Sequence, residues 1–415
     1  MNKYWLILYP DTFLWVKQNR GCIYNAKNYK KIYFENKGEL PKLIESLLDI
    51  DQLYRVDLSE ELLQKTQIKE WVNEIISSES GQLVLDDGLN KRPVSMKPEL
   101  KVQDDVKYYE WEHKRGIDGN VIDNLHKIII HINASNYGNI AYTKQTVYHP
   151  VQTSSELDHG SILSFVKNAR SCSYLREIAL VGDVTSYPNF KGLLSDILDY
   201  GFRRISVYCL DNDFLKYIET NQDWENKAIS YTVLVSDYSV IEKLLKAIKQ
   251  LPPVSFIFLI RSEEEYENAN SCIEKNELSK VEIVPIYTEE NLSFFENNLY
   301  IDSESISGIE LSKRQVFIQQ KLNIFSFGNL IVLPDGKIYA NLNDPSIGTV
   351  NDTPHSVVYR ELTEGKSWLK IRNQEPCSNC VYQWLCPSPS NYEAVIGKPN
   401  LCFIGNTSNQ LLPKS

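Results

Sequence analysis

Six continuous apolar runs in the middle of the chain constrain its fold more than any other feature. They are KIIIHIN (127–133), EIALVGD (177–183), RISVYCL (204–210), YTVLVSD (231–237), SFIFLIRS (255–262) and VEIVPIY (281–287). Amphipathic stretches such as FKGLLSDILDYG separate them. Unbroken β-branched runs between helices indicate strands buried on both faces, and therefore a parallel sheet. These units predict an α/β fold, a partial (β/α)6 barrel over about residues 106–305 whose site lies at the carboxyl ends of its strands.

Two further sections flank the barrel pattern, and a chain of 415 residues is long enough for two to three domains. Residues 1–100 begin with short apolar alternations split by turn signals and continue with amphipathic helical patterns at 40–48 and 62–76. The polar, proline-bearing stretch 86–105 predicts a linker. The third section, 306–415, contains GNLIVLPDGKIYANL, which predicts a hairpin that turns at Asp335-Gly336.

Charge and hydropathy limit the kinds of partner and the cell compartment that we expect for this chain. The net charge of −10 argues against a nucleic-acid backbone as partner, because proteins that bind one usually carry a basic face. The N-terminal apolar run ends at Pro10 and Asp11 without a small-residue cleavage site, so a strand fits better than a signal peptide. No stretch approaches the ~18 continuous apolar residues of a membrane span. We therefore expect a cytoplasmic protein with reduced cysteines, with no nucleic acid and no membrane as partner.

Four of the eight cysteines gather near the C-terminus with the spacing Cys377-x2-Cys380-x5-Cys386-x15-Cys402. A pair two residues apart can place both sulfurs on one ion, and two further thiolates complete a tetrahedral set. Four cysteines also suit a 4Fe-4S cluster, so the spacing leaves zinc and iron–sulfur open. A lone CxxC beside two incidental thiols fits a reducing compartment less well. The remaining cysteines are expected to be small core side chains: Cys22, Cys172, Cys209 and Cys272.

With the preceding LPDGKIYANL, this cysteine pattern resembles the SPASM domain, the C-terminal extension of radical S-adenosylmethionine (SAM) enzymes that modify peptides. That domain binds two auxiliary 4Fe-4S clusters. Its G-x4-C element ends here in Asn341, the cysteine expected after Cys386 is Ser390, and the first cysteine falls near Ser326. The resemblance implies that the ligands of the first auxiliary cluster are lost, whereas the four retained cysteines form the full ligand set of the second.

The middle section resembles the barrel of the same enzymes, in which a C-x3-C-x2-C motif follows the first strand. The three corresponding positions in this chain are Ser135, Asn139 and Tyr142, and none is a cysteine. The resemblance therefore implies a degenerate, pseudo-radical-SAM barrel that makes no use of S-adenosylmethionine. It is closest to the family without the cysteine motif that accompanies GG-type precursor peptides in Bacteroidales.

The second strand of the barrel pattern ends in a related substitution. The GGEP motif that binds the amino group of the cosubstrate is replaced by VGDV at 181–184. Asp183 retains a hydrogen-bond acceptor there, although an ordinary strand-end carboxylate is the interpretation that we favour.

The N-terminal section resembles the winged-helix-like peptide-recognition module of ribosomal peptide maturation systems. Such a module binds a leader peptide as an added strand, because an exposed sheet edge offers unpaired amides and carbonyls. Lys30 and Lys31 beside the edge either attract an acidic leader or guard against aggregation. For any single apolar residue of the edge or helix, packing in the module's own core is the favoured alternative. The predicted edge contains Tyr29, Lys31, Ile32, Tyr33 and Phe34, and the predicted helix face contains Ile68, Trp71, Val72 and Ile75.

Other catalytic patterns are missing from the sequence. The six histidines show no HExxH spacing, and there is no G-x-S-x-G motif and no P-loop. His131, on the first strand of the barrel pattern, is either a proton carrier or, as we favour, a buried hydrogen-bonded side chain.

The leading hypothesis is a component of a ribosomal peptide natural-product maturation system. It would bind a precursor peptide, or pair with an active maturase, without radical SAM catalysis. The alternatives are an enzyme with new chemistry in the old barrel, based on groups such as His131, Asp183 and Tyr142, and an electron-transfer partner that uses its single cluster.

Overall fold

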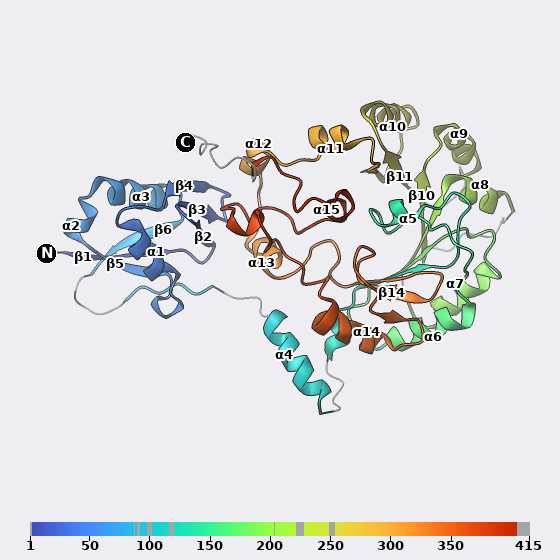
Figure 1. Cartoon of the computed structure of the whole chain (residues 1–415), viewed down its shortest axis with the longest axis horizontal. Helices are drawn as coiled ribbons and strands as arrows, with labels where there is room; N and C mark the ends of the chain where they lie inside the picture. The colour runs from blue at the N-terminus through green and yellow to red at the C-terminus, as the bar shows by residue number, and fades with distance from the viewer. Residues whose placement is uncertain are drawn as a thin grey trace.

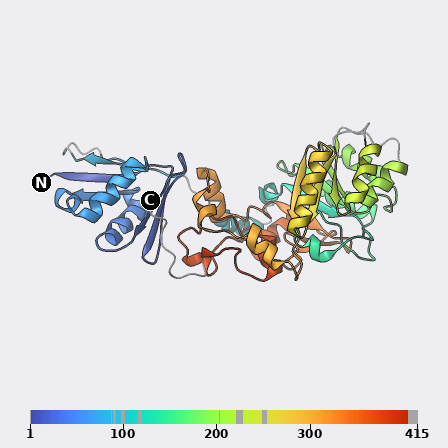
Figure 2. The same ribbon diagram turned by 90° about the horizontal axis from the view of Figure 1, so that it is seen from above.

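The chain is elongated, with a compact N-terminal module at one end and a large sheet at the other (Figures 1 and 2). The structure, a computed structural model, describes residues 2–86, 88, 92–97, 102–115, 120–202, 204–220, 228–248 and 254–404. Of the predicted linker, residues 87, 89–91 and 98–101 lie outside the described residues. Helix α4 (Val102–His113) begins before the predicted linker ends.

Two antiparallel three-stranded sheets and three helices form the N-terminal module. The first sheet has the order β5-β1-β6, from β1 (Lys3–Leu8), β5 (Arg55–Ser59) and β6 (Gly81–Leu85). The second has the order β2-β3-β4, from β2 (Thr12–Lys17), β3 (Arg20–Asn25) and β4 (Lys31–Glu35). The helices are α1 (Leu40–Leu48), α2 (Glu60–Leu63) and α3 (Thr66–Ser77). Apolar residues at helical spacing bury one face of α1 and one face of α3 in the core of the module.

The large sheet is mixed and mostly parallel, with nine strands in the order β12-β11-β10-β9-β8-β7-β13-β14-β15. Its six consecutive parallel strands are β7 (Lys127–His131), β8 (Glu177–Val181), β9 (Ile205–Leu210), β10 (Ile229–Val235), β11 (Ser255–Ile260) and β12 (Val281–Pro285). Each of the six apolar runs therefore contains a strand, which confirms the α/β prediction.

The third section of the chain contributes to this same sheet. Strand β13 (Asn329–Val332) pairs parallel to β7, and β14 (Lys337–Tyr339) and β15 (Gly348–Thr349) follow in antiparallel register. The predicted turn joins β13 to β14, and Gly336 there has a φ of 79°, which glycine adopts without steric cost.

Both faces of the parallel strands from β7 to β11 are largely buried, as their continuous apolar sequences require, whereas the edge strand β12 is partly exposed. One face packs against α6 (His159–Ala169), α7 (Phe190–Asp199), α8 (Asp211–Thr220), α9 (Tyr238–Ala247) and α10 (Glu263–Lys275). The other face packs against Tyr142, Val147 and Tyr148, from the segment between β7 and α6. The shorter helices are α5 (Ile140–Thr143), α11 (Leu292–Asn298), α12 (Ser303–Ser307), α13 (Lys313–Lys321), α14 (Pro354–Arg360) and α15 (Asn391–Ile396).

A separate apolar cluster joins the N-terminal module to the C-terminal section. Phe13, Trp15, Cys22 and Tyr24 from β2 and β3 pack with Val316, Val381 and Leu385. Helix α13, which carries Val316, lies between the module and the large sheet (Figure 1). Within the part of the chain that the structure describes, no helix combines the length and apolar character that a membrane crossing needs.

Candidate functional site

The four C-terminal cysteines line one small cavity, together with Arg372 and Asn400. The first pair is held by a 3-10 turn over Cys377–Asn379, in which the Cys380 amide donates to the Cys377 carbonyl at 3.1 Å. Cys402 is held by a parallel bridge to Ile301. The structure therefore places around one cavity the four residues that the sequence grouped by spacing.

Several N–H donors face the sulfurs in this cavity. The Arg372 Nη1 atom and the Asn400 Nδ2 atom each lie 3.7 Å from the Cys377 sulfur, and the Ile404 amide lies 3.3 Å from the Cys402 sulfur. Donors placed in this way stabilise a thiolate over a thiol.

Burial acts on the same cysteines in the opposite direction. It raises the pKa of Cys380 to about 11, and burial likewise raises the pKa of Cys386. Without a bound metal ion these two thiols stay protonated at neutral pH, so a metal centre would have to displace their protons.

The donor set of this cavity is the one that zinc and 4Fe-4S clusters share, namely four thiols. Among the described residues, however, no three His, Cys, Asp or Glu side chains come close enough to hold a single metal ion. The four thiols thus share a cavity without converging on one point. Their chemistry fits either metal centre.

The loop between the cysteines has a second, apolar side that faces the N-terminal module. Val381 and Leu385 are buried against β2 and β3. The ring of Tyr382 lies 5.5 Å from that of Tyr33 on β4, edge to face. The same short loop therefore supplies thiols to the cavity and packing to the module.

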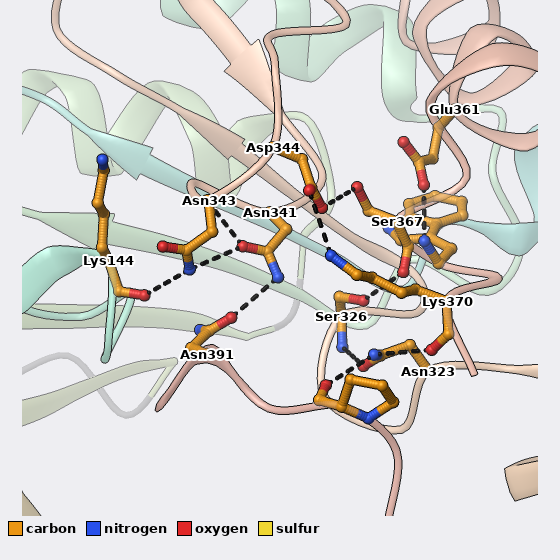
Figure 3. Close-up of polar contacts among 12 residues, drawn as sticks. Lys144, Asn323, Ser326, Asn341, Asn343, Asp344, Glu361, Ser367, Lys370 and Asn391 are labelled. Carbon is orange, nitrogen blue, oxygen red and sulfur yellow. Dashed lines mark hydrogen bonds and ion pairs between the residues drawn. The ribbon is translucent and has the colours of Figure 1, made fainter. Parts of the chain in front are cut away.

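Two of the three positions at which the resemblance expects a cysteine, Ser326 and Asn341, lie in one polar network (Figure 3). The third, Ser390, follows Pro389, whose carbonyl belongs to that network. The Asn341 amide donates to the Asn391 side chain at 2.9 Å, and the Ser326 hydroxyl donates to the Ser367 carbonyl at 3.1 Å. Ser390 caps α15, where its hydroxyl accepts from the Glu393 amide at 3.4 Å.

Asn323 connects these positions. Its side-chain amide donates to the carbonyls of Lys370 and Pro389 at 3.1 and 3.0 Å, and its side-chain oxygen accepts the Ser326 amide at 3.1 Å. A hollow of about 170 Å³ next to the network is lined by Arg372 and Cys377, which also line the thiol cavity. The thiol cavity and the polar network therefore adjoin.

The edge strand of the module differs in detail from the prediction. Strand β4 begins at Lys31, two residues later than expected, because Tyr29 has a φ of 63° and lies in the preceding turn. The ammonium group of Lys31 donates to the carbonyls of Ser307 and Ile309 at 2.9 and 2.7 Å, so it is engaged within the chain.

The apolar residues of β4 and α3 pack against each other in the module's core, which agrees with the favoured alternative. Ile32 and Phe34 point into this core, and the Phe34 ring lies 5.7 Å from that of Trp71. Gly21 on β3 has no room for a side chain because the Phe34 ring covers it. The predicted helix face is buried throughout: Ile68, Trp71, Val72 and Ile75.

Backbone groups on the outer side of β4 are free in the described structure. The Asn25 amide donates to the Lys30 carbonyl, and the Asn36 amide donates to the Asn19 carbonyl. These two bonds show which residues of β4 are hydrogen-bonded to β3, because in an antiparallel pair every second residue is. By that alternation, the N–H and C=O groups of Lys31 and Tyr33 point away from β3. Among the described residues no backbone partner meets them, so β4 retains an unpaired edge.

The three positions that the resemblance assigns to a catalytic cysteine motif have separate local roles. The Ser135 hydroxyl donates to Asp213 at 2.7 Å, and the Asn139 side chain caps α5 by accepting the Ala141 amide at 2.9 Å. The Tyr142 side chain packs on the inner face of the sheet. These roles account for each residue without a ligand.

Asp183 and His131 agree with the interpretations that we favoured. Asp183 Oδ1 accepts the amide and the hydroxyl of Thr185 at 2.8 and 2.6 Å, as an ordinary strand-end carboxylate does. His131 is fully buried and its Nε2 donates to the Val147 carbonyl at 2.9 Å. Burial lowers the His131 pKa to about 4, so this side chain is neutral at pH 7.

Two polar residues at these strand ends were missed. Asn133 links β7 to β8, because its side chain accepts the Asp183 amide at 2.9 Å and donates to the Asp183 carbonyl at 2.8 Å. Asp213, the partner of Ser135, is largely buried, and this burial raises its pKa to about 6. The sequence signal was their position near the ends of predicted strands: Asn133 ends the run 127–133, and Asp213 follows the run 204–210 by three residues.

Two comparisons with known proteins found no protein similar to this chain. A scan against models of protein families finds no match to this chain, and a search of curated proteins finds none.

Proposed function

We propose that this protein is a component of a ribosomal peptide maturation system, and that it binds a precursor peptide without radical SAM catalysis. Its three parts would be a winged-helix-like recognition module (1–100), a degenerate partial (β/α)6 barrel (106–305) and a SPASM-like domain (306–415). The observation that carries this proposal is the unpaired edge of β4, beside the loop that bears the cysteines.

A leader peptide would add to β4 as a fourth strand of the β2-β3-β4 sheet. It would exchange hydrogen bonds with the free backbone groups of Lys31 and Tyr33, each worth about 0.5–1.5 kcal/mol net. The Tyr33 side chain, which contacts Tyr382, would lie beside the added strand. The buried face of α3 would support β4 from behind and would not touch the peptide.

The inner face of the large sheet supports the non-catalytic part of the proposal. Tyr148 stacks on Tyr208 there with ring centres 4.0 Å apart. Gln145 exchanges two hydrogen bonds with the backbone of Tyr287, at 2.9 and 2.6 Å. Side chains of the chain itself therefore fill space at this face, and the three former cysteine positions offer no thiol. We expect no cleavage of S-adenosylmethionine.

We further propose that Cys377, Cys380, Cys386 and Cys402 hold one 4Fe-4S cluster, with zinc as the alternative. When bound, such a cluster ties four points of the chain together and offers a one-electron redox centre. The apolar side of the cysteine loop packs on the module, so the centre would also fix the position of β4. An active maturase of the same system is the expected protein partner.

The test of edge binding compares two substitutions at one residue. Tyr33→Ala removes the ring and keeps the backbone N–H, whereas Tyr33→Pro removes both. We expect labelled synthetic peptides tiling the precursor encoded beside the gene to bind the Ala variant at least tenfold more tightly than the Pro variant, measured by fluorescence anisotropy. Equal affinity of the two variants, or binding that survives deletion of residues 1–100, would contradict the proposal.

A separate assay addresses catalysis. The reduced, metal-loaded protein is incubated with S-adenosylmethionine, and 5′-deoxyadenosine is measured by chromatography. We expect none above the protein-free control, and steady formation would overturn the non-catalytic assignment.

A further inference from the structure

An apolar groove runs along α13 on the surface of the molecule. Its volume is about 970 Å³, and its walls come from α13, the turn that follows it and the start of β7. The apolar lining consists of Phe317, Ile318, Leu322, Ile324 and Phe327. Ile324 is 43% exposed, so part of this lining faces water. Apolar surface of this kind marks a binding site more often than a chance feature.

A second hollow continues the apolar surface on the other side of Phe317. Its volume is about 420 Å³ and it lies between α13 and the N-terminal module. Ile50 and Met96, which line it, are 68% and 74% exposed. Phe317 lines both hollows, so one apolar band crosses from the module to α13.

The charged groups that line this band are all basic. In the groove they are Lys313 and Arg314, and neither hollow contains an acidic lining residue. His126 also lines the groove, but burial lowers its pKa, so its ring is neutral at pH 7. Lys97 lines the second hollow, and burial lowers its pKa to about 7. The whole chain is acidic, with 54 Asp and Glu against 44 Lys and Arg. Lys313 is paired with Asp11 at 3.2 Å, but Arg314 has no ion-pair partner among the described residues. The groove is therefore an apolar site whose lining carries positive charge, from Lys313 and Arg314, and no negative charge, on an acidic protein.

We propose that this groove binds an acidic amphipathic helix of a partner polypeptide. Apolar side chains at i, i+3, i+4 and i+7 would enter the groove, and flanking carboxylates would meet Arg314 and, beside it, Lys313. An apolar floor with cations at its rim matches this chemistry, because the floor would bury the apolar face of the helix and the cations would pair with the carboxylates on its polar face. The site is distinct from the β4 edge, and the proposal does not depend on strand addition there.

The test uses designed peptides as probes. A fluorescein-labelled helix of about 18 residues, or five turns, carries Leu on one face and Glu on the other, and its control carries Lys in place of Glu. We expect the Glu helix to bind the intact chain at least tenfold more tightly than the Lys helix, by fluorescence anisotropy at low salt. A scrambled Leu/Glu peptide should bind at least tenfold more weakly than the patterned one.

Surface variants locate the binding. Arg314→Glu should reverse the preference between the Glu and Lys helices, and Ile324→Asp should weaken both at least tenfold. Arg170→Glu, an equal charge change at an exposed residue at the end of α6, should leave both affinities unchanged. Circular dichroism confirms that each variant is folded, as expected for exposed positions.

Three results would overturn the proposal. One is equal affinity for the Glu and Lys helices, and another is unchanged affinity in both groove variants. The third is a concentration-dependent dimer, seen by light scattering and abolished by Ile324→Asp, because it would assign the groove to a second copy of this chain.

Discussion

The thiol cavity and the polar network beside it adjoin in the C-terminal section, yet their side chains are satisfied in different ways. In the network, Asn323 and Asn341 meet hydrogen-bond partners supplied by the chain itself (Figure 3). In the cavity, four thiols line one hollow together with a few N–H donors. A region whose polar groups are hydrogen-bonded to one another keeps its shape without a ligand, whereas a cavity lined by four thiols gains most from a bound cation.

The largest effect is expected from removing one thiol. Cys386→Ala should remove nearly all bound iron and sulfide, because three thiolates do not complete the four-cysteine set. Loss of the centre should also loosen the cysteine loop on the N-terminal module, which limited proteolysis between the two would detect. Cys272→Ala, at a cysteine outside the cavity, is the control and should retain its metal. Full iron content in Cys386→Ala would remove this cysteine from the ligand set.

Arg372 lines both the thiol cavity and the hollow next to the polar network, and its substitution should give the next largest effect. Its guanidinium pairs with Glu393 at 2.8 Å, and both side chains are buried. Arg372→Met leaves a buried carboxylate unpaired and should lower the free energy of unfolding by about 3–5 kcal/mol, measured by urea denaturation. Lys275→Met breaks the exposed pair with Glu242 and should leave stability unchanged. A loss as small as that of the control would show that Arg372 is not essential to the packing of either place.

Glu361, at the edge of the network, predicts a dependence of stability on pH. Its carboxylate is buried, accepts the Trp368 amide at 2.7 Å, and has its pKa raised from 4.5 to about 7, chiefly by burial. The folded state therefore holds this proton more tightly than the unfolded state. The stability it contributes is complete below pH 4.5 and is lost as the pH rises through about 7.

Glu361→Gln tests that dependence. Between about pH 5.5 and pH 8 the wild-type protein should lose about 2 kcal/mol of unfolding free energy that the Gln variant keeps, by urea denaturation at both pH values. Parallel pH profiles of the two proteins would show that this carboxyl is charged in the folded state.

The smallest effect is expected at Ser390. Ser390→Ala removes the cap of α15 and should cost about 1 kcal/mol in thermal or urea unfolding. Ser390→Cys restores the residue that the resemblance expects, but it should add no iron, because the neighbouring positions remain Asn341 and Ser326. Extra iron in Ser390→Cys would show that the network still accepts a metal centre.

Local patterns predicted the α/β class and the parallel strands of the middle section, and the reason is physical. Each apolar run of the middle section contains a parallel strand, because burial on both faces leaves a continuous signature in the sequence. The turn at Asp335-Gly336 and the shared cavity of the four cysteines were likewise predictable, since turn chemistry and ligand spacing act over short distances.

Contacts between distant segments were not predictable in the same way. The sequence of β4 does not reveal that Lys31 would meet carbonyls of residues 307 and 309, or that Tyr29 would take a left-handed turn. Asp213 became a partner of Ser135 only because the sheet brings two strand ends together. The pairing of β13 with β7 similarly joins segments about 200 residues apart, and no local pattern encodes it.

The chain is proposed to hold one cluster at the four cysteines and none at the polar network. Iron and acid-labile sulfide, measured per chain after anaerobic purification, test this claim directly. We predict about four iron and about four sulfide per chain, the content of a single 4Fe-4S cluster. Stoichiometric zinc without sulfide, or twice this iron and sulfide, would contradict it.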